Sequence, residues 1–214
     1  MRSIITHILF LVACTAFSQR YVDTHDPKDD EIKSLLGKGN DLNGFGGVDF
    51  KVSDVVNNRV LIAGAQGGVL VNRKYIVGLG GYGIATEAKF DGLVGLDTKP
   101  LNLHGGYGGI VLGGIVGSKE VIHLIFPVLL GAGSVDVSDK NYFTNTPNDA
   151  EFTIERSAFM VIEPAAQVEF NITENFRLAA GMSYRYITGT ELQNVSDKDL
   201  SGGAVTVSFR FGRF

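Results

Sequence analysis

The chain has 214 residues, with 19 Lys and Arg against 23 Asp and Glu, so its length fits a single domain and its balanced charge argues against nucleic-acid binding. Glycine is frequent, at 28 residues, but it follows no collagen-like period and only 5 prolines occur, which excludes collagen-like and simple disordered chains. The glycines are therefore expected within packed strands.

The first residues have the pattern of an export signal. Arg2 precedes a short apolar run over 4–13, and Ala16 and Ser18 follow with cleavage-site spacing, which predicts a signal peptide over residues 1–18. The run is too short for a membrane-spanning helix, which needs roughly 20 apolar residues. Cys14, the single cysteine, lies within this signal; it is either a spectator or, because LVAC resembles a lipobox, an acylated residue.

Two further regions follow the signal. Residues 19–43 are charged and are interpreted as a periplasmic lead-in, and residues 44–214 show period-two patterns punctuated by Gly and Asn. Most of the eight strands expected there reach the roughly 9–11 residues that cross a bilayer as a tilted β-strand. The expected strands span 45–56, 59–71, 75–88, 101–116, 121–137, 156–172, 176–188 and 202–211.

The connections between these strands test a membrane barrel independently, because outer-membrane barrels have short periplasmic turns and longer external loops. With the C-terminus in the periplasm, long segments over 189–201, 138–155 and 89–100 alternate with short ones. The tight first hairpin over 56–59 breaks the alternation. The fold class predicted is therefore all-β: an eight-stranded antiparallel up-and-down transmembrane β-barrel.

Apolar and polar side chains alternate along the clearest strands, as in Leu178, Met182 and Tyr184 against Arg177 and Arg185. A soluble sandwich would show the same alternation with its faces exchanged, but in a membrane barrel the polar residues fill a narrow interior and must pair. A turn centred near Thr173 would place Glu169 opposite Arg177, and Glu163 diagonal to Arg185. The predicted interior polar network comprises Asp49, Lys51, Glu163, Gln167, Glu169, Arg177, Arg185 and Arg210.

Two regions fit the pattern less simply. The second to fifth strands combine apolar residues on both faces with many glycines, which suit either a narrow crowded barrel or packing between two soluble sheets. The last strand ends near Phe214, whose parity is opposite to that of Phe209 and Phe211. A bulge at Gly212 or fraying of the last residues would reconcile the two parities.

Several segments together resemble uncharacterised outer-membrane β-barrel proteins of Bacteroidetes-type Gram-negative bacteria: VGLGGYGIA, LHGGYGGIVLG, the hairpin from VIEPAAQVEFNIT to FRLAAGMSYRY, and the ending SFRFGRF. The resemblance covers about residues 44–214. It implies a porin-like or OmpX-like eight-stranded barrel in the outer membrane, and it implies the assembly machinery of that membrane and outer-membrane lipid as partners. It supplies no catalytic residues.

No catalytic, cofactor or metal site is predicted. The Gly-rich segments lie inside strands rather than before a helix, and His104 and His123 are expected at opposite ends of neighbouring strands. A lipid A acyl-modifying enzyme would need a Ser, a His and a carboxylate on the lipid-facing surface, and parity turns His104 toward the lumen. The function expected is structural or surface-interacting, through loops 138–155 and 189–201, with a narrow porin-like channel as the alternative.

Overall fold

The computed structural model describes residues 41–138 and 153–214. The predicted signal peptide with Cys14, the lead-in up to residue 40 and most of the loop predicted over 138–155 lie outside the described residues. The division into residues 1–18, 19–43 and 44–214 therefore stays a prediction. Among the described helices, none is long and apolar enough to cross a membrane.

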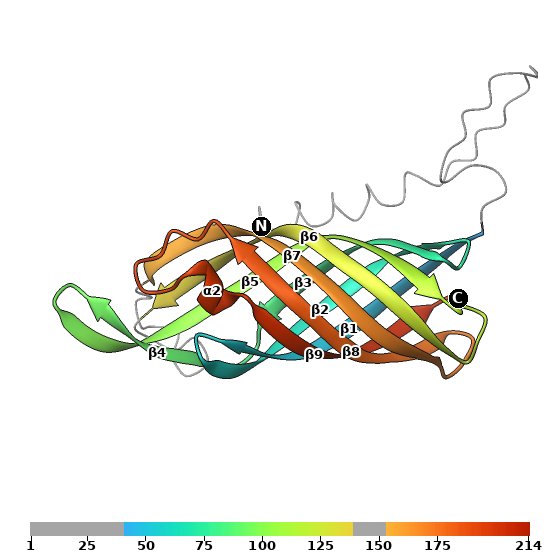
Figure 1. Ribbon diagram of the computed structural model, residues 1–214, viewed down its shortest axis with the longest axis horizontal. Helices are drawn as coiled ribbons and strands as arrows, with labels where there is room; N and C mark the ends of the chain where they lie inside the picture. Colours follow the sequence, from blue (N-terminus) through green and yellow to red (C-terminus); the bar gives the residue numbers. More distant parts are fainter. Residues whose placement is uncertain (1–40, 139–152) are drawn as a thin grey trace, which may run out of the picture. The chain divides into compact units, whose positions relative to one another are not determined.

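One antiparallel sheet contains nearly all of the described residues (Figure 1). Its segments are β1 (Leu42–Val55), β2 (Asn58–Val71), β3 (Tyr75–Ile84), β4 (Ala88–Val94), β5 (Asp97–Val116), β6 (Ile122–Ser138), β7 (Thr153–Asn171), β8 (Phe176–Thr188) and β9 (Gly202–Gly212), with the short helix α2 (Asp197–Leu200) before β9.

The sheet closes on itself. The strand order is β3-β2-β1-β9-β8-β7-β6-β5-β4, and β3 also pairs with β5. Because β3 pairs with residues 106–114 of β5 and β4 pairs with residues 97–103, the two segments share one side of β5 and occupy one position in the wall. The result is a closed eight-stranded antiparallel barrel, which confirms the predicted fold class. We call the end that carries α2 the α2 mouth, and the end where β1 begins and β9 ends the C-terminal mouth.

The connection predicted as a loop over 89–100 is instead a β-hairpin, formed by β4 and the first part of β5. A two-residue turn with Gly95 at φ +68° joins the two strands, and β5 reaches 20 residues because it runs on into this arm. The outer edge of β4 is held by two amide side chains: Asn194 donates to and accepts from the backbone of Leu93, and Asn58 donates to the carbonyl of Lys89. These contacts cover backbone groups that an edge strand would otherwise expose.

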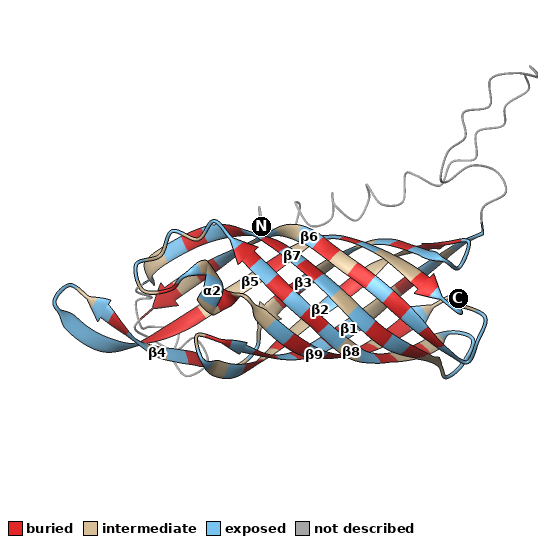
Figure 2. Cartoon of the chain, viewed as in Figure 1, coloured by how far each residue is buried: buried red, intermediate tan, exposed pale blue. Residues whose placement is uncertain are grey.

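Buried and exposed residues alternate along the strands of the barrel (Figure 2). The exposed positions carry many large apolar side chains, and the buried positions carry apolar side chains together with the polar network. On β8, Met182 is 69% exposed, whereas the following Ser183 is 8% exposed. The clearest strands have the facing that their alternation predicts. Large outward apolar residues include Val48, Phe50, Val52, Leu79, Ile110, Leu112, Leu124, Phe126, Leu130, Met160, Ile162, Met182, Tyr184, Val205 and Phe211.

Glycines on β2, β3, β5 and β6 make room for large side chains in the lumen. A Cβ on Gly64 would lie 2.2 Å from the ring of Tyr82, and one on Gly133 would lie 2.5 Å from the ring of Phe159. Real Cβ atoms do not approach that closely, so the two rings depend on these glycines. The crowded-barrel interpretation of the glycine-rich strands therefore applies here.

The last residues leave the sheet and turn inward. β9 ends at Gly212, and the ring of Phe214 lies 3.9 Å from the guanidinium of Arg177 and packs against the interior apolar residues. Phe214 therefore faces inward, as its parity indicates. The sequence offered two explanations, a bulge at Gly212 or fraying of the last residues; in the structure the strand ends before Phe214, and no bulge turns its ring outward.

Candidate functional site

The eight residues of the predicted polar network all lie buried in the barrel. The buried Asp, Glu, Lys and Arg side chains come from β1, β7, β8 and β9, which are consecutive in the wall and which we call the charged half. The strands β2, β3, β5 and β6 form the glycine-rich half, which contributes no buried Asp, Glu, Lys or Arg among the described residues. The interior charge is therefore carried by one side of the wall.

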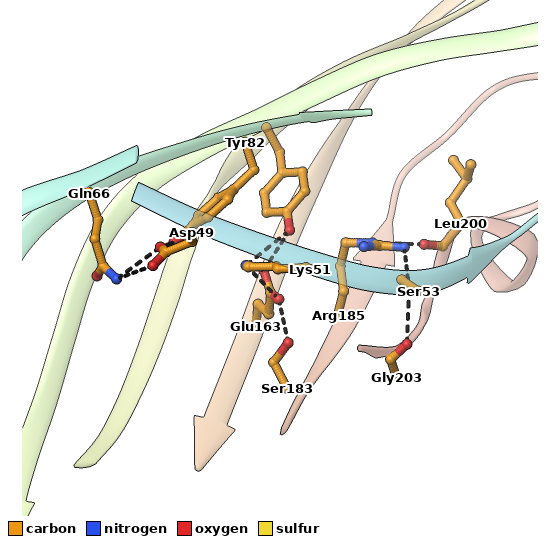
Figure 3. A network of polar contacts seen from close by, with 11 residues as sticks. Asp49, Lys51, Ser53, Gln66, Tyr82, Glu163, Ser183, Arg185, Leu200 and Gly203 are labelled. Carbon is orange, nitrogen blue, oxygen red and sulfur yellow. Dashed lines mark hydrogen bonds and ion pairs between the residues drawn. The ribbon is translucent and has the colours of Figure 1, made fainter. Parts of the chain in front are cut away.

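Glu163 is the centre of the first cluster (Figure 3). Both of its carboxylate oxygens lie 2.8 Å from Nζ of Lys51, and the carboxylate also accepts hydrogen bonds of 2.7 Å from the hydroxyls of Tyr107 and Ser183. The Lys51 ammonium lies 3.5 Å from the ring centroid of Tyr82, which adds a cation–π contact. This ion pair is saturated by hydrogen bonds, which is the condition under which a buried pair is tolerated.

Asp49 receives only neutral donors. Nε2 of Gln66 donates at 2.9 Å and 3.1 Å to its two oxygens, and the hydroxyl of Tyr82 donates at 2.7 Å (Figure 3). Lys51 on the same strand therefore faces two carboxylates, Asp49 and Glu163, so this middle level of the lumen has a surplus of negative charge.

Glu169 organises the level nearest the C-terminal mouth. Its two oxygens accept hydrogen bonds from Arg177 at 2.9 Å and Arg210 at 2.7 Å, and Nε2 of His123 lies 2.8 Å away. Arg210 also donates to Gln167 at 3.1 Å. Two guanidinium groups share one carboxylate here, so this level has a surplus of positive charge.

Arg185 is the buried charged residue nearest the α2 mouth. Its Nε donates to the carbonyl of Leu200 at 3.0 Å, and its Nη2 lies 3.4 Å from Oγ of Ser53 (Figure 3). Both acceptors are neutral. Arg185 thereby fixes the loop that carries α2 to the inside of the barrel.

The pairings expected from the sequence differ from those observed. Glu169 lies opposite Ala179, and Arg177 lies opposite Asn171, because the turn between β7 and β8 is centred one residue later than expected. Arg177 still reaches Glu169 diagonally. The carboxylate of Glu163 binds Lys51 rather than the expected Arg185, whose guanidinium is directed to the α2 loop.

The sequence reasoning missed the partners supplied by the glycine-rich half. Each strand of that half contributes one polar side chain to a carboxylate across the lumen: Gln66 and Tyr82 to Asp49, Tyr107 to Glu163, and His123 to Glu169. An available signal was that Tyr82 and Tyr107 interrupt glycine runs in strands with few other polar residues. Tyrosine hydroxyls buried in an apolar wall usually find a hydrogen-bond partner.

The prediction that His104 faces the lumen is wrong. His104 pairs in register with Asp136, which in turn pairs with the exposed Arg156 on β7, so all three belong to the outer face. Ser134, two residues before Asp136, shares this face and is exposed. The error arose because the glycines of β5 hide its alternation. Asp136 is bound by Arg156.

The α2 loop, residues 189–201, is held by acidic side chains outside the strands. Asp197 accepts hydrogen bonds from the backbone and hydroxyl of Thr190 and from the backbone of Gly189, and these bonds lower the pKa of its carboxyl. Asp199 accepts from the hydroxyl and backbone of Ser196, which likewise lowers its pKa. The backbone N–H of Val56 donates to the carbonyl of Asp199.

The lumen has little free space. Two cavities inside it measure about 30 Å³ each, one beside Asp49 and Glu163 and one below α2. A wider hollow of about 580 Å³ opens at the C-terminal mouth, lined by Arg73, Lys119, Arg177 and Arg213 among others. Within the described ranges, no three His, Cys, Asp or Glu side chains are grouped to hold a metal ion.

Neither the protein-family models nor the curated proteins compared with this chain match it. Similar solved structures include the N-terminal β-barrel domain of Pseudomonas aeruginosa OprF, at 12% identity over 79% of this chain and 96% of that chain, with a TM-score of 0.49. Neisserial surface protein A (NspA) is 12% identical over 83% of this chain and 100% of that chain, with a TM-score of 0.48. Ail of Yersinia pestis, in complex with the heparin analogue sucrose octasulfate, is 14% identical over 81% of this chain and 97% of that chain, with a TM-score of 0.43. These likenesses concern the barrel architecture alone, and the resemblance to a Bacteroidetes-type family stays a prediction.

Proposed function

We propose that this chain is an outer-membrane β-barrel protein whose side-chain-filled lumen holds it closed, and whose role is structural or surface-interacting through the α2 mouth. It acts without a catalytic centre or a cofactor. The observation that carries the proposal is the distribution of side chains across the wall: apolar residues are exposed and ion pairs are enclosed.

The exposed apolar side chains support a membrane location. They occur on successive strands around the barrel, including Phe50, Leu79, Ile110, Phe126 and Met182, whereas monomeric soluble proteins seldom expose contiguous apolar patches above a few hundred Å². A closed barrel satisfies its backbone hydrogen bonds internally, which hydrocarbon requires. Outer-membrane lipid is therefore the partner that fits the outer surface.

The interior favours a plugged barrel over a conducting channel. The Lys51–Glu163 pair, the Asp49 cluster and the Glu169 cluster extend across the lumen, and an eight-stranded wall leaves an interior just wide enough for side chains. The predicted alternative of a narrow porin-like channel would require these buried clusters to open.

The α2 mouth offers ordered structure for surface contacts. The β4–β5 hairpin extends beyond the paired wall and exposes Leu93 and Leu96, and the α2 loop is bound both to the hairpin through Asn194 and to the lumen through Arg185. Ordered loops on a rigid scaffold are where barrels carry recognition. The extracellular partner is unassigned.

Gel migration and liposome swelling test this proposal. Membrane-extracted protein should run compactly unboiled and more slowly after boiling, and liposomes containing it should not swell faster than empty ones in small sugars. Equal mobility in both gel lanes would contradict a closed membrane barrel. Rapid swelling would contradict the plugged lumen and support the channel.

Lipid A acyl modification is the second candidate, because His104, Asp136 and Ser134 share the outer face near the α2 mouth. Acyl-ester chemistry uses a serine, a histidine and a carboxylate of this kind. Mass analysis of lipid A from cells expressing the chain or Ser134→Ala tests it, with Ser157→Ala on the inner face as the control. An acyl chain lost only with Ser134 present would support the enzyme; identical lipid A in all strains would oppose it.

A further inference from the structure

The cavity below α2 contains a buried cation with an unused donor. Arg185 is 2% exposed, and its Nη1 has no hydrogen-bond partner among the described residues. The surrounding wall is otherwise apolar apart from Tyr107; it includes Ile62, Leu103, Val135, Phe159 and Leu200. A buried guanidinium with an unsatisfied N–H is costly unless another group compensates it.

The interior carboxylates are occupied elsewhere. Glu163 accepts from Lys51, Tyr107 and Ser183, and both oxygens of Asp49 accept from Gln66 or Tyr82. Glu169 is at the far level with Arg177 and Arg210. Arg185 donates to the Leu200 carbonyl and the Ser53 hydroxyl, which carry no charge, and its guanidinium lies 5.8 Å from the ring centroid of Tyr107.

From the orphan Nη1 and the apolar cavity beside it, we infer that this cavity is a binding site for a small monovalent anion, of which chloride is the abundant example. The cavity size selects the ligand. About 30 Å³ admits roughly two water-sized particles, since one needs roughly 10 to 15 Å³, so a halide fits whereas phosphate or a fatty-acid carboxylate with its chain does not. Arg185 supplies the charge and one N–H, and the apolar wall supplies polarisable contacts and excludes bulk water.

The bound anion also has a structural consequence for the α2 loop. Arg185 holds the carbonyl of Leu200, which forms part of the cavity wall, and the neighbouring Asp199 carbonyl accepts from Val56 of the β1–β2 turn. An anion that fixes the guanidinium therefore stabilises the position of the α2 loop over the α2 mouth. The inference concerns the interior and is independent of the proposed surface role.

Bromide replacement tests the site in the unmodified protein. Crystals grown in sodium bromide should show an anomalous peak within hydrogen-bond distance of Arg185 Nη1. In solution, the unfolding temperature should rise by about 3 to 5 °C for each tenfold increase in chloride above its dissociation constant, at constant ionic strength set with gluconate. A cavity holding water only, with no anomalous peak and the same unfolding temperature in chloride and gluconate, would overturn the inference.

Variants test whether the chloride dependence of the unfolding temperature arises at Arg185. Arg185→Met should abolish the chloride dependence, whereas Arg59→Met, which removes an exposed arginine at the same mouth, should retain it in full. If Arg185→Met does not fold, Leu103→Phe fills the cavity from its apolar side and should remove the chloride dependence with Arg185 intact. Chloride dependence that survives cavity filling would place the anion elsewhere and contradict the assignment.

Discussion

The charged half and the glycine-rich half of the barrel contribute differently to the filling of the narrow lumen. The charged half, β1 and β7–β9, supplies the ion pairs, and the glycine-rich half supplies space and the polar side chains of Gln66, Tyr82, Tyr107 and His123 that contact the buried carboxylates. If both halves carried long charged side chains, the narrow interior would be overfilled. The comparison teaches that the interior network depends on residues that carry no charge and on glycines that carry no side chain.

The largest expected effect comes from removing the carboxylate that the two arginines of the charged half share. Glu169→Gln leaves Arg177 and Arg210 buried without a counter-charge, and the free energy of unfolding should fall by about 3–5 kcal/mol. Urea titration of the folded band on unboiled gels measures it. The exposed Glu174→Gln at the same mouth is the control and should change little; equal effects from both would contradict the buried cluster.

The Lys51–Glu163 pair should show strong coupling across the charged half. Lys51→Met or Glu163→Leu alone leaves one buried charge unpaired and should cost several kcal/mol, about 3–5 by analogy with other buried pairs. The double variant should be more stable than the sum of the two losses predicts. Additive losses in a double-mutant cycle would mean that the pair does not interact.

A substitution in the glycine-rich half should destabilise the barrel although it changes no charged residue. Gly64→Ala places a Cβ 2.2 Å from the Tyr82 ring and 2.3 Å from the carbonyl oxygen of Gly81, so it should lower the free energy of unfolding by about 1–3 kcal/mol. Gly81→Ala is the matched control, because nothing lies within 4 Å of a Cβ built there. Similar stabilities for the two variants would contradict the tight packing at Gly64.

A smaller effect should follow from deleting one neutral donor. Tyr82→Phe removes the hydroxyl that binds Asp49 but keeps the ring beside Lys51, and should cost about 1–2 kcal/mol because Gln66 still donates to the carboxylate. Tyr184→Phe, on the exposed outer face, should leave the stability in urea unchanged. A larger loss from Tyr184→Phe would mean that the outer face carries the polar contacts.

The smallest effect belongs to the α2 loop. Hydrogen bonds from Thr190 and Gly189 lower the pKa of Asp197 in the folded state, so its stabilising contribution is present above the unfolded pKa near 3.8 and is lost as the pH falls through the lower folded pKa. Asp197→Asn should therefore slightly raise the proteolysis rate of the loop at neutral pH. The difference from the parent should vanish below the folded pKa, and a difference that persists there would exclude Asp197 ionisation as its source.

The sequence predicted the charged half well and the glycine-rich half poorly, for a physical reason. On β7 and β8 most outward positions are apolar and most inward positions are polar, so residues such as Glu169 and Arg177 show their face directly. On β5 the glycines remove the alternation, which reversed the facing of His104 and hid Tyr107 as a partner of Glu163. The hairpin formed by β4 and the start of β5 was read as a loop because its residues, such as Lys89, Asp91, Asp97 and Lys99, show no consistent apolar face.

The partner of each interior charge also could not be predicted from the sequence. Whether Glu163 binds Lys51 or Arg185 depends on a contact between β1 and β7, which are not neighbours in the wall and whose relation follows only from barrel closure. The position of Arg185 depends in addition on the α2 loop folding inward.

The facing of two consecutive residues on β8 tests the central claim most directly. Single-cysteine variants Met182→Cys and Ser183→Cys, in a chain whose one natural cysteine, Cys14, is replaced, can each carry a spin label in lipid bilayers. The account predicts that the label at 182 is accessible to lipid-dissolved oxygen, and that position 183 is shielded from it. Equal access to oxygen at both positions, or a water-exposed label at 182, would contradict a barrel that encloses its charges and presents its apolar face to lipid.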